Sequence, residues 1–273
     1  MSNPVFNDRV LKDASTTWAP PEPATDYFPP VSDGPVSPWE SPKVMTINGA
    51  ISATATLFVI FLVGATFGWM RTDTVEIDGQ QFVGTIPTLA WVGLFVGIGL
   101  TFLLMFKPKL AKFVGPVYAI AQGFFVGAIS KAYETAWDGI VIQAAGATIA
   151  VFAVMLVLYR TNIIKVTNRF RKIVVTATIG VMLFYGVTLL IRLFAGAGSV
   201  SFLHSPSLLG IAFSVFVAGL AAFNLALDFD FIERGAEQRL DKNFEWYAAF
   251  GLLVTIVWLY LEMLRLLAKL RER

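Results

Sequence analysis

Two acidic residues that follow long apolar runs are the residues of this sequence best placed to do chemistry. Asp228 follows the apolar run 208–227, and Glu262 follows a second apolar run, 248–261. A carboxylate that faces hydrocarbon costs roughly 2.5–3.5 kcal/mol on membrane-insertion scales. We therefore expect both side chains to face a protein interior or a water-filled cavity.

The neighbours of these acids follow helical spacing. Asn224 lies four residues before Asp228, so the two share a helix face, whereas Asp230 points elsewhere, toward the membrane boundary. Arg265 lies three residues after Glu262 and shares its face. If this face meets Asp228, the interior holds an acid pair with a cation beside it.

Lys269 lies four residues beyond Arg265 and shares the same face. Its position near the end of the last apolar segment suggests a second interpretation of these charges. Charged residues near the ends of membrane helices commonly extend their side chains to the membrane surface. We favour this reading for Asp230 and Lys269. For Asp228 with Glu262 the residues alone leave both readings open.

A close acid pair would have two chemical uses. Neighbouring carboxylates repel each other, so a pair could share a proton at low pH or bind a hard cation when both are ionised. Oxygen ligands favour calcium over transition metals. The sequence has no cysteine and one histidine, His204, which excludes disulfides, iron–sulfur clusters and multi-histidine metal sites.

The elements that position these acids are membrane-spanning helices. The chain has 273 residues, of which 56% are hydrophobic and 15% charged, far from the roughly 25% charged residues of soluble domains. Apolar segments of spanning length predict an all-α integral membrane protein with seven transmembrane helices, at 48–70, 88–106, 113–132, 140–159, 173–194, 208–227 and 248–267. Residues 45–273 form one membrane domain, and the proline-rich segment 1–44 is predicted to be a disordered cytoplasmic tail.

Basic residues in the short loops predict the orientation. The loop after the second helix carries Lys107, Lys109 and Lys112, and the loop 160–172 carries five more basic residues, with no acid in either. The positive-inside rule places these loops and the N-terminus in the cytoplasm. Seven spans then place the C-terminus outside, which conflicts with the basic residues of 265–273. Either the last helix is only partly inserted, or the charges of the internal loops determine the orientation despite the basic C-terminal residues. We favour seven full spans.

The third helix carries a stripe of small residues. Gly115, Ala119, Gly123 and Gly127 recur every four residues, and small faces let membrane helices approach closely. We interpret the stripe as a packing face, with a narrow pore wall as the functional alternative.

Catalytic constellations are missing from the sequence. The Gly-x-Ser-Gly segment of serine intramembrane proteases and the Gly-x-Gly-Asp motif of presenilin-like proteases do not occur. We therefore expect neither an enzyme nor a nucleic-acid-binding protein.

Three segments resemble the Bax inhibitor-1 family, also called the transmembrane Bax inhibitor motif family, which includes YccA-like proteins. They are L-D-F-D-F-I at 227–232, W-L-Y-L-E-M-L-R-L-L at 258–267, and the run from Gly115 to Ser130 that ends in G-F-F-V-G-A-I-S. The opening S-N-P-V-F is similar to actinobacterial members.

The resemblance implies six helices around a central seventh, and a calcium leak gated by pH through two acids. These acids fall on Asp228 and Glu262, the family's basic residue falls on Lys109, and Gln122 stands where many relatives carry Glu. Arg265, where some relatives have a neutral polar residue, is the other candidate for the counter-charge. An arginine beside the pair would repel a cation, and the inserted stretch 233–245 would lengthen the loop before the last helix.

We therefore expect a pH-sensitive calcium leak channel or cation transporter of the cell membrane. Protonation would break the ion pair and release the last helix. The expected partners are the lipid bilayer and calcium or other cations, without a further cofactor. The alternative is a non-conducting membrane regulator of a protease or a stress response, which docks a membrane protein through the tail.

Overall fold

The computed structural model describes residues 44–77, 80–195 and 206–273, and the structural statements below concern these residues. Apart from Val44, the predicted tail lies outside this part of the chain, and so does His204.

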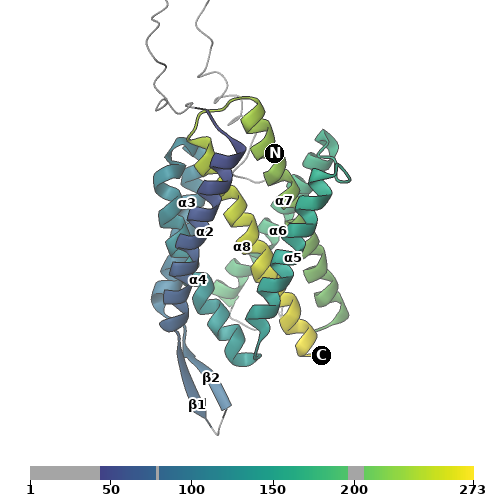
Figure 1. Cartoon of the computed structure of the whole chain (residues 1–273). Helices are drawn as coiled ribbons and strands as arrows, with labels where there is room; N and C mark the ends of the chain where they lie inside the picture. Colours follow the sequence, from purple (N-terminus) through teal and green to yellow (C-terminus); the bar gives the residue numbers. More distant parts are fainter. Residues whose placement is uncertain (1–43, 78–79, 196–205) are drawn as a thin grey trace, which may run out of the picture.

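Seven helices and one small hairpin make up the described structure (Figure 1). All seven helices are long and apolar enough to cross a membrane, which confirms the predicted all-α membrane class. The helices are α2 (Ile47–Met70), α3 (Thr88–Phe106), α4 (Ala111–Ala136), α5 (Ile140–Arg160), α6 (Asn168–Ala195), α7 (Leu208–Glu237) and α8 (Phe244–Arg271). A 3-10 turn, η1 (Pro108–Leu110), precedes α4, and the antiparallel strands β1 (Asp73–Ile77) and β2 (Gln80–Thr85) join α2 to α3.

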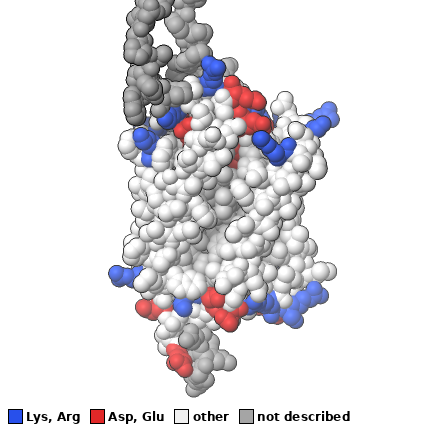
Figure 2. All heavy atoms as spheres, in the orientation of Figure 1, with Lys and Arg blue, Asp and Glu red and all other residues white. Residues whose placement is uncertain are grey.

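The helix ends gather on two faces (Figure 1). One, which we call the basic-loop face, holds the start of α2 and the α3–α4, α5–α6 and α7–α8 connections. The opposite face holds the β1–β2 hairpin, the α4–α5 connection and the end of α8. Figure 2 shows charged side chains at both ends and an uncharged belt between them, as a lipid-embedded surface requires.

Helix α8 lies in the middle of the bundle, as predicted for the last helix. It packs against α2, α4, α5 and α7, while α3 packs on α4 and α6 packs mainly on α7. Its 28 residues span about 42 Å at 1.5 Å per residue, more than the ~30 Å of hydrocarbon. Helix α8 is therefore long enough for the full span that we favour, and α2 begins and α8 ends on opposite faces.

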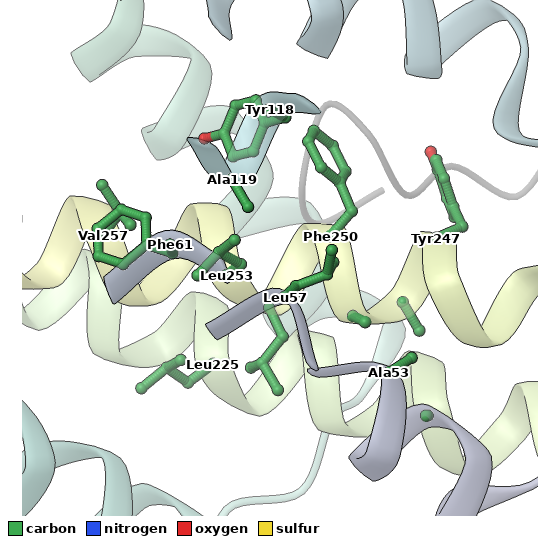
Figure 3. Packing of buried hydrophobic residues seen from close by; sticks show 14 of the residues in the cluster. Ala53, Leu57, Phe61, Tyr118, Ala119, Leu225, Tyr247, Phe250, Leu253 and Val257 are labelled. Carbon is green, nitrogen blue, oxygen red and sulfur yellow. The ribbon is translucent and has the colours of Figure 1, made fainter. Parts of the chain in front are cut away.

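Large apolar side chains at helical spacing hold α8 in the core. Phe250, Leu253 and Val257 are buried along one side of the helix, facing Leu57 of α2 (Figure 3). The Phe250 ring meets the Tyr118 ring of α4 edge to face, with centroids 4.7 Å apart. Such contacts fix the depth and rotation of α8, and with them the position of its polar residues.

The small stripe of α4 lies against α2. A Cβ atom added to Gly127 would lie 1.9 Å from the carbonyl oxygen of Ala65, and one added to Gly123 would lie 2.2 Å from that of Phe61. Helix α2 contributes a glycine to the same contact, since a Cβ atom added to Gly68 would lie 2.0 Å from the carbonyl oxygen of Phe124 in α4. The packing interpretation of the stripe is confirmed, and the stripe is a helix contact rather than a pore wall.

Helix α7 extends ten residues beyond the predicted end at 227. Asp228 therefore lies inside the helix, and most of the stretch 233–245, predicted to lengthen a loop, is helical. The charges that end the apolar run do not end the helix, and Asp230 is neutralised by Arg171 of α6 and Arg234 of α7. The short α7–α8 connection is tied to the start of α2: the Met45 amide donates to the Leu240 carbonyl, and the buried Glu245 accepts from the Thr46 amide and hydroxyl.

The glycine contact between α2 and α4 makes a first testable prediction. Gly127→Ala should lower the free energy of unfolding by about 1–3 kcal/mol, the usual effect of overpacking a tight contact. Thermal unfolding in detergent measures it. The matched control is Gly146→Ala, where an added Cβ meets no atom within 4 Å; this change should leave stability unchanged or raise it slightly. Equal stabilities for both variants would contradict the packing account.

Candidate functional site: a buried polar column

Helix α6 presents one polar residue to the bundle interior at every seventh position. Arg171, Thr178 and Tyr185 are spaced seven residues apart, so they lie along one side of the helix. Val174 and Val181 fill the positions between them and are buried. Each of the three polar residues meets a partner on α7 or α8.

The first layer, near the basic-loop face, is an ion-paired cluster around Asp230. Its Oδ2 accepts from Nη2 of Arg171 at 2.8 Å and lies 2.6 Å from Nη2 of Arg234. The side chains of Arg171 and Asp230 are only 10% and 13% exposed. Asp230 lies near the membrane boundary, as predicted, and lines a polar pocket there. The prediction that its side chain extends to the membrane surface is wrong, because Arg171 and Arg234 hold it inside the bundle. Beside this cluster, the Tyr159 hydroxyl donates to Glu233.

The second layer contains Asp228 and Asn224, which are 0% and 2% exposed. The Asn224 amide donates to the Thr178 hydroxyl at 2.8 Å and to the Leu220 carbonyl at 2.9 Å, which ties α7 to α6. As the spacing predicted, the two α7 residues are both turned inward. Asp228 is an acid that the fold holds wholly away from lipid and from bulk water.

The third layer is formed by Glu262, Arg265 and Tyr185. Oε2 of Glu262 accepts from Nη1 of Arg265 at 2.5 Å and from the Tyr185 hydroxyl at 3.3 Å. Arg265 also donates to the Tyr185 oxygen at 2.6 Å and lies over its ring. Glu262 is 1% exposed, and its second oxygen, Oε1, is buried without a hydrogen bond from the described residues. The triangle joins α8 to α6, and its carboxylate retains one uncommitted acceptor.

The fourth layer, near the opposite face, is Lys269. This residue is 2% exposed, and its Nζ donates to the Gly210 carbonyl at 2.9 Å and the Ser214 hydroxyl at 2.8 Å. The prediction that Lys269 extends to the membrane surface is therefore wrong. Oxygen acceptors at the start of α7 hold its ammonium group inside the bundle instead.

The contacts of Lys269 set the relative depths of the two acids in the column. They bring Lys269 of α8 level with Gly210 and Ser214 of the antiparallel α7. Along α7, Asp228 lies about 21 Å beyond Ser214, and along α8, Glu262 lies about 10 Å before Lys269, at 1.5 Å per residue. Counted from Gly210 instead, Asp228 lies about 27 Å away, so the two carboxylates differ in depth by about 10–17 Å.

The structure does not bring Asp228 and Glu262 together as a direct pair. Calcium takes six to eight oxygen ligands, and acids at different depths do not supply them jointly. Within the described ranges, no group of three Asp, Glu, His or Cys residues is placed to hold a metal ion. The predicted calcium site shared by Asp228 and Glu262 therefore does not fit the structure. The column is a series of separate charged groups at different depths.

The other predicted site residues lie in different places. Arg265 contacts Glu262, as its spacing predicted. Lys109 lies in η1 on the surface, is exposed, and forms no ion pair with a described residue. Gln122 is buried, but its amide donates to the Leu94 carbonyl of α3 at 3.4 Å and lies against Gly97. Gln122 therefore joins α4 to α3, away from the column.

The sequence did not lead to several members of the column, among them the three on α6. Arg171 is predicted above only as a loop charge, and Thr178 and Tyr185 lie within an apolar segment. The seven-residue spacing from Arg171 through Thr178 to Tyr185 is the signal that would have found them, because it puts three polar groups on one helix face.

These features define a polytopic α-helical membrane protein with seven long helices, three of which, α6, α7 and α8, enclose a column of buried ionisable groups. The chain belongs to the Bax inhibitor 1 like family, whose sequence model matches residues 3–272. The family resemblance of the three segments is thereby confirmed. A comparison with curated proteins finds no match to this sequence.

The Asp230 cluster makes a stability prediction. Asp230→Asn should lower the free energy of unfolding by about 3–5 kcal/mol, because it leaves the buried Arg171 without its counter-charge. Thermal unfolding in detergent measures the effect, with the exposed Asp138→Asn as control. The loss should shrink when Arg171→Met is already present, since the stranded cation is then gone. An equal loss in both backgrounds would show that the ion pair is not the cause.

Proposed function

We propose that this protein is a pH-sensitive cation leak channel or transporter, and that the polar column is its ion pathway. The observation that carries the proposal is the column itself. Ionisable residues inside a membrane bundle are costly, and they commonly mark ion or proton routes. Here they occur in four successive layers between α6, α7 and α8, from Asp230 to Lys269.

Asp228 is the station for the cation in this proposal. It is fully buried, it lies between the Asp230 cluster and the Glu262 triangle, and its carboxylate can replace part of a cation's hydration shell. Calcium is the first cargo to test, since the family resemblance implies it and carboxylate oxygens suit it. Because the two acids form no joint site, calcium would pass along the column as cargo rather than reside in it.

Glu262 is the pH-sensitive latch. In the structure its carboxylate holds Arg265 and Tyr185, and so joins α8 to α6. Its uncommitted Oε1 can take a proton, and a neutral carboxyl group no longer attracts the Arg265 guanidinium. Protonation therefore weakens the α6–α8 contact. It also frees Arg265, whose side chain is 30% exposed, to move away from the cation route.

The orientation follows from the charge of the loops. We propose that the basic-loop face lies in the cytoplasm of a cell with the protein in its plasma membrane, so that the chain leaves the membrane outside the cell. Lys107, Lys109 and Arg160 then lie on the side that the positive-inside rule requires. In this orientation the Asp230 cluster is at the cytoplasmic end of the column.

The pathway is tested by cation flux into proteoliposomes loaded with a calcium-sensitive dye. Asp228→Asn should reduce calcium flux by about tenfold or more at every pH, because it removes the buried charge that stabilises a dehydrated cation. The exposed Asp138→Asn, the same chemical change outside the column, should conduct like the wild type. Wild-type flux in the Asp228→Asn variant, with correct folding, would exclude Asp228 from the pathway.

The alternative function, a non-conducting membrane regulator, is separated by the same assay. It predicts no flux above that of empty liposomes for the wild type at any pH. That result would remove the channel proposal and leave the column as a structural network.

A further inference from the structure

An apolar groove opens on the lipid-facing side of the bundle between α2 and α5. Its volume is about 530 Å³, within the range of roughly 300–1,000 Å³ typical of small-molecule sites. Ile51, Ala55 and Phe58 line it from α2, Ile149 and Leu156 from α5, and Leu252 from α8. Figure 2 shows a hollow running down the uncharged belt between the two helices.

The groove has the depth of one leaflet of a bilayer. Its lining begins at Ile47 on α2 and at Arg160 on α5, both at the basic-loop face, and reaches Phe58 and Thr148. These stretches correspond to about 16 and 18 Å of helix. Half of the hydrocarbon core is ~15 Å thick. The groove therefore runs from the headgroup level to the middle of the membrane and stops there.

A polar pocket continues the groove at its outer end. Tyr159, Arg160 and Glu233 line both spaces, and Lys165 and Glu237 line the polar one alone. Arg160, Lys165 and Glu237 are exposed and form no ion pair with a described residue. Two exposed cations and one exposed acid thus lie beside the mouth of an apolar channel, next to Glu233 and the paired Asp230 and Arg234.

We propose that this composite site binds one phospholipid of the surrounding leaflet, with a zwitterionic, amine-bearing headgroup of the phosphatidylethanolamine type. One acyl chain occupies the groove between α2 and α5. The phosphate lies against Arg160 and Lys165, since guanidinium and ammonium groups are the usual partners of phosphate oxygens. The primary ammonium lies against Glu237, which a purely anionic headgroup would leave unpaired. The proposal does not depend on cation conduction.

The charge pattern and the depth together favour a lipid over other occupants. A second protein chain would need no cationic group at headgroup level, whereas a phospholipid requires one at that level and an apolar space below it. The groove supplies both in the right order. The bound headgroup would also lie next to the Tyr159–Glu233 hydrogen bond, at the start of the polar column.

Native mass spectrometry of the delipidated full-length protein, titrated in detergent with phosphatidylethanolamine or phosphatidylglycerol, tests the site. The wild type should retain one phosphatidylethanolamine and bind phosphatidylglycerol more weakly. Ala55→Trp, which fills the groove, should abolish this binding, whereas Ala150→Trp, at an exposed position on a different side of α5, should preserve it. Equal binding by both variants, or no bound lipid on the wild type, would overturn the proposal and leave the groove to segment 1–43 or to a second copy.

The headgroup contacts are tested separately, with variants that keep the apolar lining of the groove. Arg160→Ala should weaken binding about tenfold or more, the effect of losing a charged hydrogen bond, while the exposed Arg169→Ala should not. Glu237→Gln should weaken phosphatidylethanolamine binding and leave phosphatidylglycerol binding unchanged. If the wild type binds both lipids equally, or if Arg160→Ala has no effect, the proposed headgroup assignment is wrong.

Discussion

The cost of placing charge inside a membrane is the constraint on which this structure depends. Each buried ionisable group must be neutralised or hydrogen-bonded by the protein, because lipid hydrocarbon provides neither hydrogen bonds nor counter-charges. Asp230 has two arginines, Glu262 has Arg265 and Tyr185, and Lys269 has two oxygen acceptors. Since the partners come from different helices, satisfying the charges also determines how α6, α7 and α8 are arranged.

Two kinds of contact divide the bundle accordingly. On one side, α2 and α4 are held by glycine faces and apolar packing, where backbone meets backbone at close range. On the other side, α6 meets α7 and α8 through the polar residues that recur along its inner face. A contact based on packing is difficult to switch, whereas a contact based on an ion pair responds to a single proton. This difference is why we assign the moving part to the α6–α8 contact.

Much of the fold could be predicted from the sequence. Hydropathy placed all seven helices, and the start and end of α3 were predicted to the residue. The end of α7 was not, because hydropathy falls at Asp228 while the helix continues wherever its charges find partners. The β1–β2 hairpin was missed as well, since its strands are short and carry no apolar run.

The candidate site could be predicted only in part. The inward-facing positions of Asp228 and Glu262 followed from the cost of exposing them to lipid, and Arg265 followed from helical spacing. Their relative depth did not follow, because it depends on the register between α7 and α8, which the Lys269 contacts reveal. A family resemblance predicts which residue types occur at which positions of the chain. It does not predict how far two helices are shifted along each other.

Calcium flux into proteoliposomes at pH 6 and pH 8, with the wild type beside Glu262→Gln, is the sharpest test of a proton-operated latch at Glu262. We expect greater wild-type flux at pH 6, by at most about tenfold per pH unit for a single titrating group. In Glu262→Gln, the flux should be the same at both values and close to the acidic level of the wild type. A variant that keeps the full pH dependence of the wild type would contradict the assignment of Glu262 as the latch.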